Sequence, residues 1–367
     1  MFSADDHRYM AEALRLAEQG LYTTMPNPRV GCVIVKNGQV VGRGAHLRAG
    51  EPHAEVFALQ QAGSAAQGAD AYITLEPCSH HGRTPPCADA LLKAGVRRAV
   101  AAMQDPNPKV AGAGLARLAE QGIDTASGLM EAQARDLNPG FISRMTRGRP
   151  FVRSKIAASL DGGTALANGV SQWITGEAAR QDVQHWRARS CAILTGSSTV
   201  EADDPMMTVR LAELVEIKRG RQPLRVVADS RLKISLEAKI LQGGNVLVAY
   251  ASDPESRAEF LRAAGAELLH LPDSHGRVCL QGLMKALAQR EINEVLVEAG
   301  ARFNGVLLEM NLIDEFLLYY APVLLGDAAR GMLGMTPLAA MSQRRQLEII
   351  DIRHVGADLR LRARPQT

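Results

Sequence analysis

The chain has 367 residues, of which 46% are hydrophobic and 22% are charged, and its formal net charge is +3. This length exceeds what one hydrophobic core usually serves, so two domains are expected. The small net charge and an aromatic content of 4% argue against nucleic-acid and membrane partners.

The N-terminal stretch MFSADDHRYM lacks the charged and then apolar pattern of a signal peptide. No apolar run approaches the roughly 20 residues that a transmembrane helix needs. The five cysteines are an odd number and lie far apart, which does not fit a disulfide framework. A reducing, cytoplasmic location is therefore expected, and there a cysteine cluster more often binds a metal.

The first 145 residues alternate helix-like and strand-like segments. Helices are predicted at 5–20, 54–63, 87–95 and 114–122, and strands at 30–46, 70–76, 97–103 and 123–128. The first helix places Met10, Ala13, Leu14 and Ala17 on one face. Asn37-Gly38 splits the segment 30–46 into a hairpin. This order of elements predicts a layered α/β domain with parallel pairing.

A boundary is expected in the basic segment 141–155, where Gly148 and Pro150 precede a new strand. Beyond it, strands are predicted at 150–159, 190–199, 223–230, 245–250, 294–300 and 314–326, and helices at 175–190 and 304–313. The sequence therefore predicts two α/β domains, at 1–146 and 147–367.

The stretch TLEPCSHHGRTPPC holds Cys78 and Cys87, with His80 and His81 between them. A catalytic zinc typically has three protein ligands and a water in the fourth position, and it lowers the pKa of that water to about 7. His53, in the upstream stretch GEPHAEV, is a candidate third ligand. A closed site of both cysteines with His80 and His81 is the alternative, and it would leave His53 without a purpose.

Glu55 lies two residues after His53, where Pro52 indicates the start of a helix. A side chain there can reach over the metal-bound water, so Glu55 is predicted to shuttle a proton. Zinc deaminases carry the signature H-x-E…P-C-x-x-C. Here the second cysteine follows nine positions after the first instead of three, which indicates a subfamily with a longer loop.

Ten motifs in order resemble the bifunctional deaminase/reductase family of riboflavin biosynthesis. They are TTMPNPRVGCVIV, GAHLRAGEPHAEV, TLEPCSHHGRTPPC, MQDPNP, VAGAG, LNPGF, KIAASLDG, SQWIT, ILTGSSTVEADDPMMTVR and VEAGARFNG, spanning residues 23 to 305. The resemblance implies a cytidine-deaminase-like α/β/α layered domain followed by a dihydrofolate-reductase-like α/β domain. It implies zinc-dependent deamination of a diaminopyrimidinone ribosyl phosphate, and then reduction of its ribosyl group to ribityl by NADPH.

The resemblance also implies roles for individual residues of the first domain. His53, Cys78 and Cys87 match the zinc ligands, and Glu55 matches the proton donor. The candidate contacts to the pyrimidine substrate are Asn27, His46, Arg83, Asp105 and Asn107, of which His46 and Arg83 would lie on the phosphate side. The alternative for the two Pro-Asn-Pro stretches is a purely structural turn.

No G-x-G-x-x-G or Walker A loop occurs in the second domain, but a glycine-bearing turn precedes a predicted helix near residue 300. By resemblance, NADPH contacts fall at Ala157, Trp173, Thr199, Asp203, Ser230, Gly300, Ala301, Arg302, Phe303, Asn304, Gly305 and Val306. Contacts to the ribosyl phosphate fall at Lys155, Ser171, Arg187, Met207, Arg210 and Glu298. Two positions depart from the family: Gly163 replaces a basic residue, and Met207 replaces leucine.

Two other functions stay open at this point. One is a zinc nucleobase deaminase with an unrelated nucleotide-binding second domain, and the other is a structural zinc domain fused to a nucleotide sensor. The expected partner is a small pyrimidine ribosyl phosphate, with no nucleic acid and no membrane, and the family implies a homodimer.

If His53 is the third ligand, His80→Ala and His81→Ala should each retain stoichiometric zinc, measured by metal analysis of the purified protein. Loss of metal in either variant would make that histidine the ligand.

Overall fold

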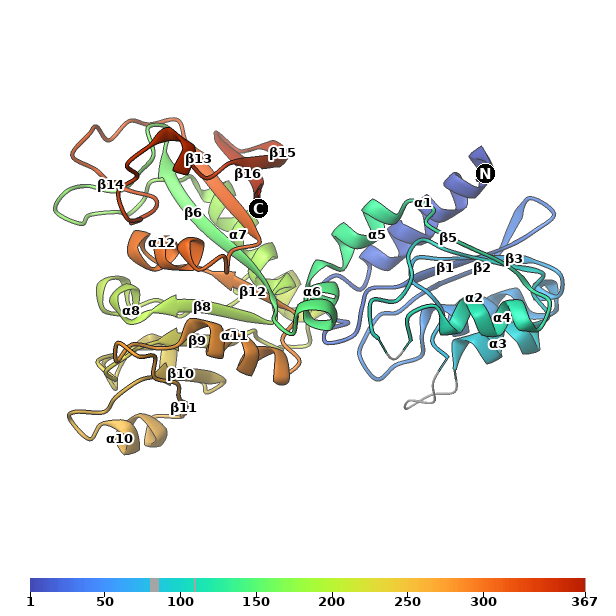
Figure 1. Ribbon diagram of the computed structural model, residues 1–367, viewed down its shortest axis with the longest axis horizontal. Helices are drawn as coiled ribbons and strands as arrows, with labels where there is room; N and C mark the ends of the chain where they lie inside the picture. Colours follow the sequence, from blue (N-terminus) through green and yellow to red (C-terminus); the bar gives the residue numbers. More distant parts are fainter. Residues whose placement is uncertain (80–85, 109, 367) are drawn as a thin grey trace. The chain divides into compact units, whose positions relative to one another are not determined.

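The computed structural model describes residues 1–79, 86–108 and 110–366. The chain divides into two compact units, Met1–Gly148 and Arg149–Thr367 (Figure 1). Among the described residues, every helix is too short or too polar to span a bilayer. Each unit is built on its own sheet.

The first unit is a five-stranded sheet between two layers of helices (Figure 1). In spatial order the strands are β2 (Gln39–Ala45), β1 (Gly31–Lys36), β3 (Asp70–Ile73), β4 (Arg98–Ala101) and β5 (Asp124–Ser127). The helices are α1 (Ala4–Glu18), α2 (Ala54–Ala62), α3 (Cys87–Ala94), α4 (Ala113–Glu120), α5 (Glu131–Leu137) and α6 (Pro139–Arg147). Strands β3, β4 and β5 are parallel, whereas β1 is antiparallel to β2 and β3. Helices α2, α3 and α4 cover one face, and α1 and α5 cover the other.

The main sequence expectations for this unit are confirmed. The predicted apolar face of α1 is buried, and Asn37 and Gly38 form the hairpin turn with φ angles of 50° and 77°. The strand expected at 70–76 is shorter, because regular pairing ends at Ile73. Helices α5 and α6 were not predicted, although the motif LNPGF joins them at Asn138.

The second unit has a nine-stranded sheet (Figure 1). In spatial order the strands are β11 (Ala266–His270), β10 (Val246–Tyr250), β9 (Leu224–Ala228), β8 (Ala192–Gly196), β12 (Glu294–Val297), β6 (Phe151–Ser159), β13 (Glu315–Ala321), β16 (Asp358–Pro365) and β15 (Leu347–Val355). The strands from β11 to β13 are parallel, and β16 and β15 add an antiparallel hairpin. Short strands β7 (Gly163–Ala165) and β14 (Arg330–Gly331) pair separately.

Helices cover both faces of this sheet. They are α7 (Glu177–Arg189), α8 (Ser197–Asp203), α9 (Ala212–Ile217), α10 (Ala258–Ala263), α11 (Leu280–Gln289) and α12 (Ala301–Glu309). On β12, Val295 and Val297 join the core formed with α11 and α12, whereas Leu296 packs with Trp186 of α7. Because successive side chains of a strand point to opposite faces, α7 lies on the face opposite to α11 and α12.

Two boundaries in this unit differ from the sequence prediction. The strand expected at 190–199 ends at Gly196, where α8 begins. The helix expected at 304–313 is present but begins and ends earlier, because α12 spans Ala301–Glu309 with Gly300 as its N-cap. Gly305 lies inside the helix, as predicted, and a Cβ there would be 2.4 Å from the carbonyl oxygen of Gly334. The C-terminal hairpin β15–β16 was not predicted.

A network of buried charged side chains links three neighbouring strands of this sheet, β12, β6 and β13. Arg153 of β6 is fully buried, 2.7 Å from Glu315 of β13 and 3.1 Å from Glu294 of β12. Its guanidinium lies 4.7 Å from the centre of the Trp186 ring. Burial alone would raise the pKa of Glu315, but Arg153 and Arg362 outweigh it and lower this pKa from 4.5 to about 2.

The first prediction from the fold concerns Glu315. Replacement by alanine removes the nearer of the two carboxylates that Arg153 contacts and also the partner of Arg362, so unfolding free energy should fall by about 3–5 kcal/mol. Both tryptophans, Trp173 and Trp186, lie in this unit, so urea unfolding followed by tryptophan fluorescence reports on it. The control Glu267→Ala breaks an exposed pair with Arg290 and should cost less than about 1 kcal/mol.

The same measurement has a defined pH dependence. The pKa of Glu315 is depressed in the folded state, so its contribution is present above about pH 4.5 and is lost as the pH falls toward 2. The stability difference between wild type and Glu315→Ala should shrink over this interval, and a constant difference would contradict the assignment.

Candidate functional site

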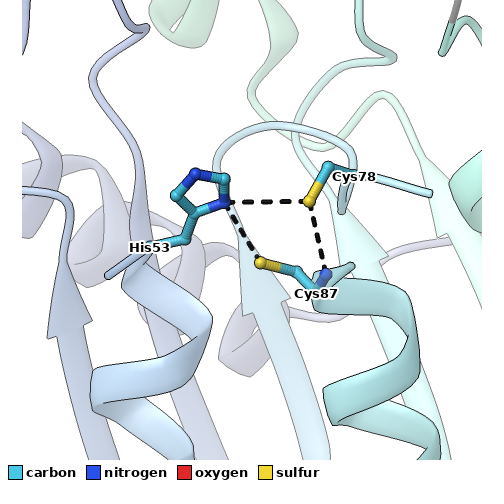
Figure 2. A group of neighbouring side chains, drawn as sticks. All are labelled: His53, Cys78 and Cys87. Carbon is cyan, nitrogen blue, oxygen red and sulfur yellow. Dashed lines mark hydrogen bonds between the residues drawn. The ribbon is translucent and has the colours of Figure 1, made fainter. Parts of the chain in front are cut away.

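Three predicted metal ligands meet in the first unit (Figure 2). His53 is the N-cap of α2, Cys87 is the first residue of α3, and Cys78 lies in the segment that follows β3. Their ligand atoms all lie within 4.8 Å of one another. His53 Nδ1 is 3.2 Å from Cys87 Sγ and 3.7 Å from Cys78 Sγ, while the Cys87 amide donates to Cys78 Sγ at 3.3 Å.

These residues fit a zinc ion. Imidazole and thiolate are ligands that zinc prefers, and a tetrahedral site separates nitrogen and sulfur by about 3.5 Å, close to the two distances above. A hydrogen bond with the Cys87 side chain is the main cause that lowers the pKa of Cys78, to about 4, and His53 adds to it. A three-ligand set leaves a fourth position open, which is the arrangement of catalytic zinc sites.

Glu55 lies in the first turn of α2 and is buried beside the ligands. Among the described residues, its Oε2 atom has no hydrogen-bond partner. Burial raises its pKa, which favours a carboxyl group that can carry a proton. An unsatisfied buried oxygen at this position fits a reacting water or substrate that completes the site.

Asn27 and His46 lie next to the metal ligands. Asn27 Nδ2 is 3.1 Å from His46 Nε2, and His46 Nδ1 is 3.1 Å from the carbonyl oxygen of Pro52. The His46 ring meets the His53 ring edge-on, with centroids 5.4 Å apart. Burial lowers the pKa of His46. A neutral His46 that orients Asn27 fits these contacts better than a cation that meets a phosphate.

The loop after β4 carries the other predicted contacts of this unit. The Asn107 amide donates to Asp105 Oδ1 at 2.8 Å, so the stretch QDPNP does contain a local Asx turn. Glu76, which the sequence reading overlooked, accepts the Asp105 amide at 3.0 Å. Its only signal was an acid between a strand and Pro77. Arg83, His80 and His81 lie outside the described residues.

The second unit contains a cavity of 1520 Å³. It lies at the carboxyl ends of β6, β8 and β12, the usual position of a ligand site in an open α/β sheet. The structure brings together most predicted residues in its lining, namely Lys155, Ala157, Ser171, Trp173, Arg187, Thr199, Asp203, Met207, Arg210, Glu298, Gly300, Ala301, Arg302, Phe303 and Asn304.

Three predicted cofactor contacts do not line this cavity: Ser230, Gly305 and Val306. The Ser230 hydroxyl accepts the Val278 amide at 3.1 Å. Gly305 is packed against Gly334. The Asn304 side chain is bonded within the protein, since its Nδ2 donates to the carbonyl oxygen of Ala299 and its Oδ1 accepts from the Ser154 hydroxyl.

Arg187 and Glu298 form a buried pair at the cavity wall. Arg187 donates two parallel hydrogen bonds to the Glu298 carboxylate, at 2.6 and 2.9 Å, and a third to Thr208 O at 3.0 Å. The family resemblance implies instead that Arg187 contacts the ribosyl phosphate. Burial lowers the pKa of the neighbouring Lys155. The wall therefore combines an ion pair with an amine of weakened basicity.

Arg180 and Tyr319 line the cavity but were not predicted from the sequence, whereas Trp173 and the departure at Gly163 were noted there. Trp173 is 71% exposed at the rim, with the Arg180 guanidinium 4.6 Å from its ring centre. Tyr319, which resembled an ordinary core residue of β13, lines the cavity and donates to Asp182. At Gly163, a Cβ would lie 2.9 Å from that of Ala329, so any side chain there requires neighbours to move.

Comparisons with known proteins match both units. The family model "RibD C-terminal domain" matches residues 150–361, and "Cytidine and deoxycytidylate deaminase zinc-binding region" matches residues 3–103. The chain is 51% identical to riboflavin biosynthesis protein RibD of Escherichia coli, covering 96% of this chain and 98% of that protein. It is 42% identical to RibD of Bacillus amyloliquefaciens, covering 98% and 96%.

Two solved structures are similar over nearly the whole chain. Acinetobacter baumannii RibD gives a TM-score of 0.91 at 47% identity, covering 99% of each chain. A diaminohydroxyphosphoribosylaminopyrimidine deaminase/5-amino-6-(5-phosphoribosylamino)uracil reductase from Thermotoga maritima gives 0.85 at 31% identity, also covering 99% of each.

The metal site predicts the effect of a sulfur-to-oxygen exchange. Cys78→Ser removes a thiolate that zinc prefers, so the purified variant should lose most of its zinc in metal analysis. The control Cys279→Ser makes the same exchange at the N-cap of α11, where serine is a favoured residue, and should keep its zinc. Full zinc content in Cys78→Ser would remove Cys78 from the ligand set.

Proposed function

The chain belongs to the RibD family of riboflavin biosynthesis enzymes, and we propose that residues 1–146 carry its deaminase and residues 147–367 its reductase. The division into units at Gly148 and the two family matches support these bounds. The matches also span both units, which leaves no unrelated second domain and disfavours a deaminase of free nucleobases.

The protein is a bifunctional enzyme that uses zinc and NADPH. It hydrolytically deaminates 2,5-diamino-6-ribosylamino-4(3H)-pyrimidinone 5′-phosphate, and it then reduces the ribosyl side chain to ribityl. The product is 5-amino-6-(5-phospho-ribitylamino)uracil. The observation that carries this conclusion is the coexistence, in one chain, of the His53–Cys78–Cys87 cluster and the large cavity of the second unit.

In the deaminase, zinc held by His53, Cys78 and Cys87 would act as a Lewis acid and make a water nucleophilic near neutral pH. Glu55 takes one proton from the attacking water and delivers it to the ring nitrogen. It then takes the second proton from the newly formed hydroxyl group and delivers it to the amino group, which leaves as ammonia while the ring carbonyl forms. Its buried position and raised pKa suit both the uptake and the release of this proton. Asn27, held by His46, reads the ring, and Asp105 and Asn107 contact the ring or ribose.

In the reductase, bound NADPH would supply the hydride that reduces the open-chain imine of the ribosylamine. The first turn of α12, with Gly300 as its N-cap, offers backbone N–H groups to the pyrophosphate. Ala157, Trp173, Thr199 and Asp203 line the rest of the cofactor path.

The ribosyl phosphate contacts Lys155, Ser171, Met207, Arg210 and the Arg187–Glu298 pair. Because Arg187 already donates two bonds to Glu298, we assign the direct phosphate contact to Arg210 and a supporting role to Arg187. Contacts from Arg83, Ser230, Gly305 and Val306 stay predictions.

Homodimer formation and a cytoplasmic location also stay predictions. An exposed edge supports the first, because β15 borders the sheet and leaves Ile349 and Ile352 more than half exposed. Such an edge is suited to pairing with a second copy.

The two-site proposal is tested by Glu55→Gln. Loss of the proton carrier should lower ammonia release by about 10²- to 10⁴-fold, while zinc content and NADPH oxidation on pre-deaminated substrate stay at wild-type levels. Ammonia and the nicotinamide absorbance are followed in parallel. The control Glu18→Gln changes an exposed carboxylate of α1 and should leave both activities intact. Joint loss of both activities in Glu55→Gln would refute two independent sites.

A further inference from the structure

Glu76 binds an unusual number of backbone amides next to the metal ligands. It follows β3, directly precedes Pro77 and Cys78, and is only 3% exposed. Its Oε2 accepts the amides of Asp105 and Gly112 at 3.0 and 2.9 Å. Its Oε1 accepts the amides of Gly114 and Leu115 at 2.8 and 3.2 Å. One buried carboxylate therefore satisfies four main-chain donors.

Two of these donors belong to the first turn of α4. Gly112 is the N-cap of this helix and has no side chain to cap it. Glu76 supplies the missing acceptor from a distant part of the sequence, and it bonds the second and third helical residues, Gly114 and Leu115. These are the amides that an N-cap side chain normally satisfies. The negative charge also suits the positive end of the helix dipole.

Close packing leaves this arrangement little freedom. A Cβ on Gly114 would lie 1.9 Å from the carbonyl oxygen of Pro77, so α4 begins directly against the chain between Glu76 and Cys78. The Glu76 amide in turn donates to Met103 O at 3.0 Å. Glu76 thus holds the chain after β4 at two points, Met103 through its backbone and Asp105 through its side chain.

The held segment is the one that carries the proposed substrate contacts. Asp105 is bonded to Glu76 through its amide, and its carboxylate is oriented by the Asn107 amide. Cys78 is two residues from Glu76 along the chain. The spacing between a metal ligand and the substrate-reading loop therefore depends on one side chain.

We propose that Glu76 is a positioning residue of the deamination, which fixes the described part of loop 104–112 against the metal-bearing segment Pro77-Cys78. This inference rests on the proposed contact of that loop with the pyrimidine substrate. Glu76 itself touches neither the metal ligands nor the reacting atoms in this role.

Replacing Glu76 by glutamine tests this role with little change in side-chain size. A carboxylate has two acceptor oxygens, whereas glutamine has one acceptor and an amino group that can only donate. Glu76→Gln has nearly the same size, but it turns a donor toward two of the four amides. The matched control is Glu120→Gln, which makes the same change on an exposed residue of α4.

In steady-state deaminase kinetics, Glu76→Gln should lower kcat/KM by about 10²-fold, the order expected for a misplacement near 1 Å, mainly through a higher KM. Zinc content and NADPH oxidation on pre-deaminated substrate should match wild type and Glu120→Gln. A purely structural role predicts activity that falls in proportion to the folded, zinc-loaded fraction at unchanged KM. That result would overturn the proposal.

The four backbone amides bonded to Glu76, called the Glu76 clamp below, can also be tested by hydrogen exchange on the wild-type protein, even if the variant fails to fold. The Asp105 and Gly112 amides lie outside regular strands and helices, so only their bonds to Glu76 should slow them. Their exchange should be as slow as that of amides in β3. Exchange as fast as in the exposed hairpin turn at Gly38 would overturn the proposal.

Asp105→Ala separates this inference from the function on which it rests. A higher KM in Asp105→Ala with an unchanged KM in Glu76→Gln would leave the loop contact standing and refute the role of Glu76. A higher KM in Glu76→Gln with an unchanged KM in Asp105→Ala would support Glu76 and refute only the Asp105 contact.

Discussion

Both sites depend on one geometric constraint: the carboxyl ends of parallel strands meet at the same edge of a sheet. In the first unit this edge brings Cys78, after β3, near Asp105, after β4. In the second unit it gathers Glu298 after β12 and Thr199 after β8 around the cavity. Other site residues lie at the N-terminal ends of helices: His53 at α2, Cys87 at α3 and Gly300 at α12. Two different reactions are thus built on the same feature of α/β sheets.

Buried charges are handled differently at the two sites. In the reductase unit, Arg153 and Arg187 are paired with carboxylates, so the polar layer beneath α7 is held by ion pairs. In the deaminase unit, Glu76 is satisfied by main-chain amides, while Glu55 Oε2 has no partner among the described residues. Because all its hydrogen bonds are made, Glu76 holds its surroundings rigidly. Glu55 instead keeps one oxygen available for proton transfer.

The metal cluster could be predicted from the sequence because its ligand types and local spacing are specific, and Pro52 and Pro86 adjoin the helix starts. The first-unit elements up to β5 could be predicted because their periodicity is clear, whereas α5 and α6 were not predicted. The role of Glu76 could not be predicted, because its partners are backbone amides 29 to 39 positions away. Nearly every residue has a backbone amide, so the sequence does not show which of them would bond to Glu76. The Arg187–Glu298 pair spans 111 positions, so only the fold reveals that the two bonds of Arg187 are already used. The start of α12 lies three residues before the predicted one, with Gly300 as its N-cap, and Gly305 packs closely against Gly334.

The clamp at Glu76 has a consequence for how the enzyme can diverge. Every residue except proline has a backbone N–H, so the side chains of Asp105 and Leu115 can change without removing a partner of Glu76. The strict demands are the acid itself, the exclusion of proline at the four donor positions, and a glycine at 114. The loop can therefore accumulate new side chains, and with them new base preferences, on a scaffold whose geometry is inherited unchanged.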